Sequence, residues 1–391
     1  MLSHTYKALV VGAGPGGLAA TKSLLDVGLK NICWVDRTFG GGRLNELYRE
    51  ISSNTRVGIY LDAVNSSQTC GQIIESTPKP NAFTELSKFK RDETCDLSYT
   101  GDLIEMLEKG ITAKQSVSKV LGQVEEARFE GSTWKVQIAG ESNKIETTRL
   151  FLCTGSKPII PDFHKEYNSN LKVLDLDQCM IKSQLPSLLD SDSTRKVIGV
   201  IGNSHSGILV CRNLIETKIR ENMNLKIMNF KRSPIKYAIY RDDGTIINDN
   251  TGLKGSTADW AKTYMEPSGS EYEKYKDVVI EQIDTSSNEK GIYTERMKEC
   301  THLIYSIGYT PNLYPKIVID NKEVDQDDLE FNQNTTEFSI RGGKTINGLY
   351  GLGIAHPEKT KDPNGNYENA VGLAKFFKFA DDHKELWKRN E

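Results

Sequence analysis

The chain has 391 residues, of which 37% are hydrophobic and 26% are charged, and its formal net charge is −3. This length is more than one ordinary core needs and predicts two domains of unequal size. The proportions of hydrophobic and charged residues exclude a disordered chain, and the small negative net charge argues against nucleic acid as a partner.

No apolar run reaches the length of a membrane span. The chain enters an apolar strand almost at once, which leaves no room for a signal peptide, and its last residues match no retention or peroxisomal signal. The seven cysteines are dispersed, without a Cys-x-x-Cys pair or a zinc-ligand pattern. We therefore expect a cytoplasmic protein with buried free thiols and no metal site.

The first distinctive pattern is an apolar strand at residues 8–11, followed by glycines and a helix that runs to about Gly28. Gly12 would allow the sharp turn, Gly14 would let a pyrophosphate approach the backbone, and Gly17 would let the helix pack close to the strand. Free N–H groups and the helix dipole favour a pyrophosphate at the helix N-terminus. The predicted contact residues of this turn are Gly12, Gly14, Pro15, Gly16 and Gly17.

The next strand, at residues 31–35, leads into Asp36 and Arg37. An acid at this position accepts hydrogen bonds from the adenosine ribose, so Asp36 completes a dinucleotide-binding fingerprint, and Arg37 beside it is assigned to the same site. Strand, glycine turn, helix, second strand and acid follow in order, which makes the signal far more specific than the glycine spacing alone.

A second copy of this pattern follows an apolar strand at residues 195–201. Gly202 and Gly207 stand where the first and third glycines belong, but Ser204 replaces the second, which affects how closely the phosphates approach the backbone. The predicted contact residues of this turn are Gly202, Asn203, Ser204, His205 and Ser206. His205 would lie over the phosphates of a nucleotide, or it would cap the helix that begins there.

The strand after this second helix, at residues 225–230, ends in Lys231 and Arg232 instead of an acid. An acid would hold a free 2′-hydroxyl, whereas these two cations would pair with the 2′-phosphate of NADPH. The alternative is that they are solvated charges at the end of a strand. The repeat context favours the phosphate.

Two further turns accompany these copies. Residues 134–152 alternate like a small antiparallel meander, whose last strand runs into Thr154 and Gly155. A near-copy of this strand, glycine turn and proline occurs at residues 301–311, around Gly308.

The order of these four motifs resembles that of the flavoproteins with two dinucleotide-binding domains. That group contains the pyridine nucleotide-disulfide reductases, the flavin-containing and Baeyer–Villiger monooxygenases and the N-hydroxylating monooxygenases. The resemblance implies an α/β fold with two Rossmann-like dinucleotide-binding domains, the second inserted in the first. It assigns FAD to residues 1–195 and 309–391 and NADPH to residues 196–308, with Thr154 and Gly155 in contact with a cofactor.

The same resemblance places a turn at Gly353 in the flavin site, before a helix at residues 366–377 whose N-terminus would face the flavin pyrimidine ring. Disulfide reductases carry a Gly-Asp pair at this turn, whereas here Ile354 follows the glycine. This departure and the missing cysteine pair disfavour thiol chemistry. His356 would face the flavin and act in catalysis, or it would be a hydrogen-bonded structural residue at the turn.

Residues 38–55 are similar to the monooxygenase pattern of a glycine pair, a bulky residue and an Asn-Thr element. By that resemblance Arg43 would lie near the FAD phosphates and Asn54 near the reactive edge of the flavin, where its amide would act in catalysis by hydrogen-bonding a flavin hydroperoxide. The alternative for Asn54 is a turn-forming residue in a polar loop. The monooxygenase subclass stays open, because residues 161–167 lack the glycine and the spacing of the Baeyer–Villiger fingerprint.

Together these features predict an FAD-dependent, NADPH-using oxidoreductase that oxygenates a small molecule with molecular oxygen through a flavin hydroperoxide. Two alternatives stay open. One is an NAD(P)H-dependent flavin reductase or dehydrogenase acting on a non-thiol acceptor, and the other is a non-catalytic flavin redox sensor. The missing cysteine pair and the missing Gly-Asp element favour the monooxygenase.

Overall fold

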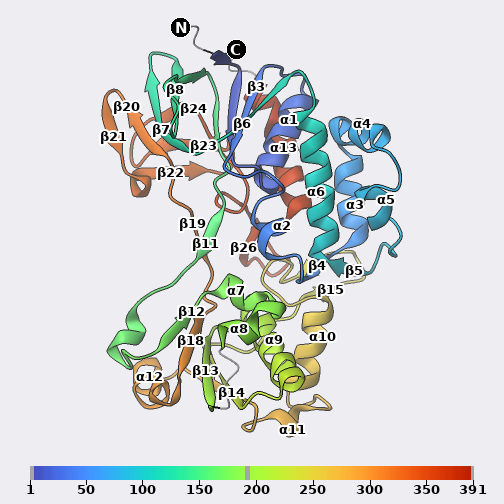
Figure 1. Ribbon diagram of the computed structural model, residues 1–391, viewed down its shortest axis with the longest axis vertical. Coiled ribbons are helices and arrows are strands. Elements are labelled where there is room, and N and C mark those ends of the chain that lie inside the picture. Colours follow the sequence, from blue (N-terminus) through green and yellow to red (C-terminus); the bar gives the residue numbers. More distant parts are fainter. Residues whose placement is uncertain (1–3, 190–193, 389–391) are drawn as a thin grey trace.

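The computed structural model describes residues 4–189 and 194–388. It has two lobes joined by a pair of antiparallel connecting strands, β11 (Ser156–Pro158) and β19 (Tyr309–Pro311), as Figure 1 shows. Both ends of the described chain belong to the first lobe, and the second lobe is inserted between the two connecting strands. The predicted α/β architecture, with one dinucleotide-binding unit inserted in another, is confirmed.

The first lobe is built on a seven-stranded sheet with the order β22-β23-β24-β10-β2-β3-β6. Its parallel strands are β2 (Ala8–Val11), β3 (Ile32–Asp36), β6 (Val117–Leu121), β10 (Leu150–Leu152) and β24 (Thr345–Gly351). Two antiparallel strands extend it, β22 (Leu329–Asn332) and β23 (Glu337–Ile340). The central strands are buried on both faces, which explains their continuous apolar runs.

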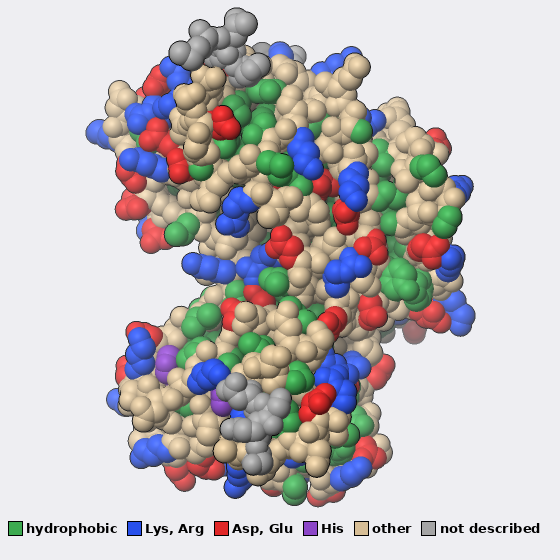
Figure 2. Space-filling view, viewed as in Figure 1, with side chains coloured by type: hydrophobic (Ala, Val, Ile, Leu, Met, Phe, Trp, Pro, Cys, Tyr) green, Lys and Arg blue, Asp and Glu red, His purple; other side chains and the backbone are tan. Residues whose placement is uncertain are grey.

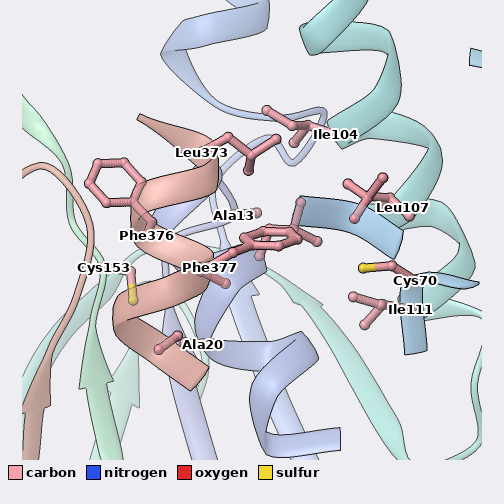
Figure 3. Close-up of a cluster of buried hydrophobic side chains, with 14 of the residues drawn as sticks. Ala13, Ala20, Cys70, Ile104, Leu107, Ile111, Cys153, Leu373, Phe376 and Phe377 are labelled. Carbon is pink, nitrogen blue, oxygen red and sulfur yellow. The ribbon is translucent and has the colours of Figure 1, made fainter. Parts of the chain in front are cut away.

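Helices cover one face of this sheet. The inner layer consists of α1 (Pro15–Asp26), α6 (Leu97–Thr112) and α13 (Leu373–Lys388), and the outer layer consists of α3 (Val57–Asn65), α4 (Gln68–Ser76) and α5 (Ala82–Leu86). Phe377, Leu107 and Cys70 come from α13, α6 and α4 and share one apolar cluster (Figure 3). The predicted end of the first helix is confirmed, because α1 stops at Asp26 and Gly28 follows with φ +82°.

A six-stranded sheet covers the other face. Its order is β1-β9-β8-β7-β20-β21, with β1 (His4–Tyr6), β7 (Val124–Glu130), β8 (Thr133–Ile138), β9 (Ile145–Thr147), β20 (Lys316–Ile319) and β21 (Lys322–Val324). The predicted meander is correct for β8 and β9 and wrong for its last strand. β10 consists of three apolar residues and pairs in parallel with β2 and β24 in the central sheet, where all three are buried. β9, by contrast, pairs with β8 in the meander.

The second lobe contains a five-stranded parallel sheet with the order β12-β18-β13-β14-β17. The strands are β12 (Lys172–Leu174), β13 (Lys196–Ile201), β14 (Leu225–Lys231), β17 (Ile280–Asp284) and β18 (His302–Tyr305). The expected start of this unit at residue 196 therefore differs from the structure. β12 precedes that residue yet pairs with β18, so the second lobe begins directly after β11.

The helices of the second lobe are α7 (Leu176–Met180), α8 (Leu185–Leu188), α9 (His205–Glu221), α10 (Gly255–Tyr264), α11 (Tyr272–Tyr275) and α12 (Glu289–Arg296). A hairpin of β15 (Ile239–Tyr240) and β16 (Ile246–Ile247) precedes α10. Short 3₁₀ helices of this lobe lie at Phe163–Glu166, Lys182–Gln184 and Met297–Glu299, and one of the first lobe lies at Gln326–Asp328.

Three short elements of the first lobe lie at the junction of the lobes. They are α2 (Arg43–Leu47) and the antiparallel strands β4 (Ser52–Arg56) and β5 (Thr94–Asp96). Figure 2 shows that the surface is hollowed between the lobes on the side of the connecting strands.

The predicted helix at residues 366–377 is wrong in its first part. β26 (Tyr367–Ala370) pairs with β25 (Glu358–Lys361), and the helix begins only at Leu373. Gly372, with φ +137°, separates strand from helix. Among the described residues, no helix has the length and apolar character that crossing a membrane requires.

Candidate functional site

The two glycine-rich turns have the same construction. Backbone φ is +104° at Gly12 and +110° at Gly202. A Cβ at Gly12 would lie 2.2 Å from the carbonyl oxygen of Cys153, and a Cβ at Gly202 would lie 2.2 Å from that of Ser306. Only glycine fits either turn, so the repeat in the sequence is a repeat in three dimensions.

The third glycine of each motif lets the helix approach its own turn. A Cβ at Gly17 would lie 1.8 Å from the carbonyl oxygen of Gly12, and one at Gly207 would lie 2.4 Å from that of Gly202. Both helices α1 and α9 therefore begin directly over their own turns, and each leaves its first N–H groups without partners inside the helix.

The second position of each motif has a different residue type in the two copies but the same backbone conformation. Gly14 has φ −75° and ψ −172°, and Ser204 has φ −82° and ψ −173°. A Cβ at Gly14 would meet no atom within 4 Å, so the missing side chain leaves space that the protein itself does not fill. The Ser204 side chain makes no capping hydrogen bond and is exposed, so its hydroxyl is available to a ligand.

The first strand end carries a carboxylate that is already oriented. Asp36 Oδ2 accepts a hydrogen bond from Ala13 N at 2.7 Å, and its Oδ1 accepts from Thr38 N at 2.9 Å and Phe39 N at 3.0 Å. These bonds fix the carboxylate beside the glycine turn, where an adenosine ribose bound along α1 would lie. Arg37 is exposed next to it.

The second strand end carries cations. Lys231 Nζ donates to Gln282 Oε1 at 2.9 Å, whereas the Arg232 side chain is 69% exposed and its Nε lies 3.2 Å from Glu289 Oε1. Such a surface ion pair contributes little to stability, so the guanidinium is not tied to one partner. Asn203 in the adjacent turn donates from Nδ2 to the carbonyl oxygen of Ser233 at 2.6 Å and so fixes the loop after Arg232.

Several buried polar atoms without a partner lie at these turns. Among the described residues they include Thr154 Oγ1, His205 Nδ1 and Ser306 Oγ. Burial, with a smaller effect from Lys254, lowers the pKa of His205 to about 4, so its imidazole is neutral. Buried groups of this kind are normally paired, and their concentration here fits two bound dinucleotides.

A third loop borders the first turn. Four consecutive residues from Phe39 to Gly42 have positive φ, and a Cβ at Gly42 would lie 3.0 Å from Gly14 Cα. The buried carboxylate of Glu108 on α6 accepts hydrogen bonds from Gly40 N at 2.7 Å and Gly41 N at 3.0 Å. Burial raises the pKa of Glu108, and the two N–H groups oppose this effect.

Arg43 is placed at the junction of the lobes. Its Nη1 donates to the carbonyl oxygen of Ser156 at 2.9 Å, and its guanidinium forms an ion pair with Asp177 on α7. Asp177 Oδ1 also accepts from Tyr48 Oη at 2.7 Å and Tyr309 Oη at 3.0 Å. One carboxylate thus joins α2, α7 and β19.

Comparison with known proteins agrees with this arrangement. Residues 6–334 match the family described as pyridine nucleotide-disulphide oxidoreductase. The chain belongs to this family. A curated relative, "Monooxygenase AgnR1" from Paecilomyces divaricatus, is 37% identical over an alignment of 383 residues that covers 95% of each chain. The solved flavin-containing monooxygenase from Stenotrophomonas maltophilia shares the fold, with a TM-score of 0.55 at 12% identity over 98% of each chain.

The chain is accordingly an FAD-dependent oxidoreductase of this family. Its cysteines do not support the disulphide chemistry in the family's description. All seven are free and buried, and burial raises the pKa of every one, to about 11 for Cys70 and Cys95. A thiol with a raised pKa is a poor nucleophile at neutral pH.

The C-terminal turn of the oxidoreductase packs against the first glycine motif. Gly353 has φ +89°, and a Cβ on Gly16 would lie 2.7 Å from Gly353 Cα. His356 is 3% exposed, and its Nε2 lies 3.3 Å from Tyr314 Oη. Its ring centroid is 5.0 Å from that of Phe338, and burial lowers its pKa to about 3. These surroundings favour the structural alternative for His356.

Asn54 lies on β4, where the second lobe meets the first. Its side chain is exposed, and its Oδ1 accepts a local hydrogen bond from Thr55 Oγ1 at 3.4 Å. Helix α10 begins beside this strand, since a Cβ at Gly255 would lie 3.5 Å from Ser53 O. Asn54 therefore lies at the junction of the two lobes.

Glu108 and Asp177 belong to the site, although no sequence motif predicts them. Their partners in the glycine loop and on α2 are distant in sequence, and neither residue belongs to a local motif. The only signal was an acid on the buried side of an amphipathic helix in the case of Glu108. Among the described residues, no group of histidines, cysteines and acids is arranged to hold a metal.

Proposed function

We propose that this oxidoreductase is a monooxygenase that uses NADPH and molecular oxygen to oxygenate a small molecule. The overall reaction is NADPH, H⁺, O₂ and substrate to NADP⁺, water and oxygenated substrate. The observation that carries the proposal is the burial of all seven cysteines, which leaves a member of a disulphide-oxidoreductase family without a reactive thiol. The 37% identical relative named as a monooxygenase supports the same assignment.

FAD is proposed to lie along α1. Backbone N–H groups after Gly14 would hold its pyrophosphate, Asp36 would accept from its ribose, and Thr154 Oγ1 would find the partner it lacks. When bound, FAD would supply the redox chemistry, and oxygen would reach the substrate through the proposed flavin hydroperoxide. We propose that Asn54 orients the oxygen at the edge of this site.

NADPH is proposed to lie along α9. The N-terminus of α9, with the Ser204 and Ser206 hydroxyls, would hold the pyrophosphate, and Arg232 would pair with the 2′-phosphate. Arg232 supports NADPH over NADH because it occupies the strand end where an acid would repel that phosphate.

The test is the visible spectrum of the purified protein during anaerobic addition of NADPH or NADH, followed by air. We expect a yellow protein that NADPH bleaches faster than NADH, and a transient species between the reduced and oxidised spectra when oxygen returns. Immediate return to the oxidised spectrum with stoichiometric hydrogen peroxide would instead identify a reductase. A protein that neither nucleotide reduces would point to a flavin sensor.

A further inference from the structure

Asp177 of the second lobe is buried, and its donors come from the first lobe and from the connecting strand β19. Its side chain is 5% exposed, and the ion pair with Arg43 and the hydrogen bonds from Tyr48 and Tyr309 occupy both carboxylate oxygens. Tyr48 and Tyr309 pack against the apolar core of the second lobe. In such surroundings a charged hydrogen-bonded network is strong when complete and unfavourable when one member is removed.

Two of the donors that meet at Asp177 directly follow a glycine turn. Arg43 follows the glycine loop that packs against Gly14, and Tyr309 follows the turn at Gly308. Arg43 also binds the carbonyl oxygen of Ser156, next to the turn at Thr154 and Gly155. In Figure 1, α2 and α7 face each other across the lobe junction, beside β11 and β19.

The covalent connection between the lobes does not fix their orientation alone. It consists of β11 and β19, which pair over three residues each. A separate set of contacts holds the hairpin β25–β26 to the second lobe, where Glu368 accepts hydrogen bonds from Asn250 N at 3.0 Å and from the Thr251 hydroxyl. Loss of the Asp177 contacts would therefore change the angle between the lobes without separating them.

We propose that Asp177 is a positioning residue for hydride transfer. Through Arg43, Tyr48 and Tyr309 it holds the nucleotide lobe at the angle that brings the nicotinamide of one cofactor to the flavin of the other. This inference rests on the proposed function. The reaction transfers a hydride, that is a proton with two electrons, from the nicotinamide C4 to flavin N5. The rate of such a transfer falls about a hundredfold when the reacting atoms are misplaced by about 1 Å.

The substitution Asp177→Asn tests this role with the FAD-loaded protein. The amide keeps the shape and still accepts from the two tyrosines, but it lacks the charge that holds Arg43. We expect anaerobic flavin reduction at saturating NADPH to slow at least about tenfold. FAD content, the Kd of NADPH within about twofold, and the reoxidation rate of dithionite-reduced flavin should be unchanged.

The matched control is Glu50→Gln. Glu50 also joins the lobes, since its Oε2 accepts from Ser183 N at 3.0 Å, but both residues are exposed. Wild-type reduction by Asp177→Asn, or a parallel loss of FAD, of NADPH binding and of reoxidation, would overturn the positioning role. If NADPH does not reduce the wild type, the proposed function fails. Small-angle X-ray scattering then decides the inference, because an Asp177→Asn profile identical to those of wild type and Glu50→Gln would overturn it.

Discussion

Asp36 and Lys231 occupy the same position in two copies of one structural unit and carry opposite charges. Each residue follows the last strand pair that borders its glycine turn, Val11 with Val35 in one copy and Ile201 with Phe230 in the other. Because an acid at this point binds a ribose hydroxyl and a base binds a phosphate, this one difference distinguishes the nucleotides for which the two copies are suited.

The exchange of charge predicts the effect of Arg232→Ala. We expect the KM for NADPH to rise about tenfold or more, since a charge-assisted bond to phosphate contributes about 1.5–3 kcal/mol. The KM for NADH should change less than twofold, because NADH has no 2′-phosphate. Steady-state kinetics with both nucleotides measure this, and equal effects on the two would remove Arg232 from the phosphate site.

The first glycine motif allows protein packing and cofactor binding to be separated. In Gly17→Ala the new Cβ would lie 1.8 Å from a carbonyl oxygen, so we expect a loss of about 3 kcal/mol or more in the free energy of unfolding. In Gly14→Ala no atom lies within 4 Å of the Cβ, so the apoprotein should keep its stability within about 0.5 kcal/mol.

Gly14→Ala should weaken the binding of FAD, although it leaves the stability of the apoprotein unchanged. The methyl group of Gly14→Ala would stand in the space for the pyrophosphate, and the Kd of FAD should rise at least about tenfold. Urea unfolding of the apoprotein and fluorescence titration with FAD check the two parts. Wild-type FAD affinity in Gly14→Ala would mean that the pyrophosphate lies elsewhere.

The two glycine turns were predictable because each is a local pattern of strand, turn and helix whose geometry excludes other residues. The contacts that orient them were not. Glu108 reaches Gly40 from another helix, and Asp177 reaches Arg43 from the other lobe, so their roles depend on the folded chain. The wrongly predicted helix start at residue 366 has a similar cause, because the strand Tyr367–Ala370 meets its pairing strand β25 only in the folded chain.

His356 predicts a pH dependence of stability. Folding lowers its pKa from 6.5 to about 3, so its contribution is present above pH 6.5 and is lost as the pH falls toward 3. The loss amounts to about 2 kcal/mol between pH 7 and pH 5, from about 1.4 kcal/mol for each pH unit below the unfolded pKa. In His356→Phe, which keeps an aromatic ring among Phe331 and Phe338, this part of the pH dependence should disappear.

Urea unfolding at the two pH values, wild type against variant, isolates this contribution, because His205 titrates in both proteins. The same variant examines the catalytic alternative. We expect the rates of flavin reduction and of reoxidation to stay within about threefold of wild type, since the imidazole is enclosed by aromatic rings. A fall of about a hundredfold in either rate would instead indicate that His356 acts in catalysis.

Asn54 has the opposite environment, and its prediction concerns oxygen. Its side chain is exposed and makes only a local hydrogen bond, so Asn54→Ala should fold with a stability within about 0.5 kcal/mol of wild type. If the amide stabilises the oxygen-carrying form of the flavin, its loss should leave reduction by NADPH unchanged and raise the share of NADPH oxidation that ends as hydrogen peroxide severalfold. Peroxide yield per NADPH consumed measures this share.

Asn65→Ala, which removes another exposed amide from the end of α3, is the control. Equal peroxide yields from both variants and wild type would mean that the Asn54 amide has no part in the reaction with oxygen, and the turn-forming alternative is already excluded because Asn54 lies within β4.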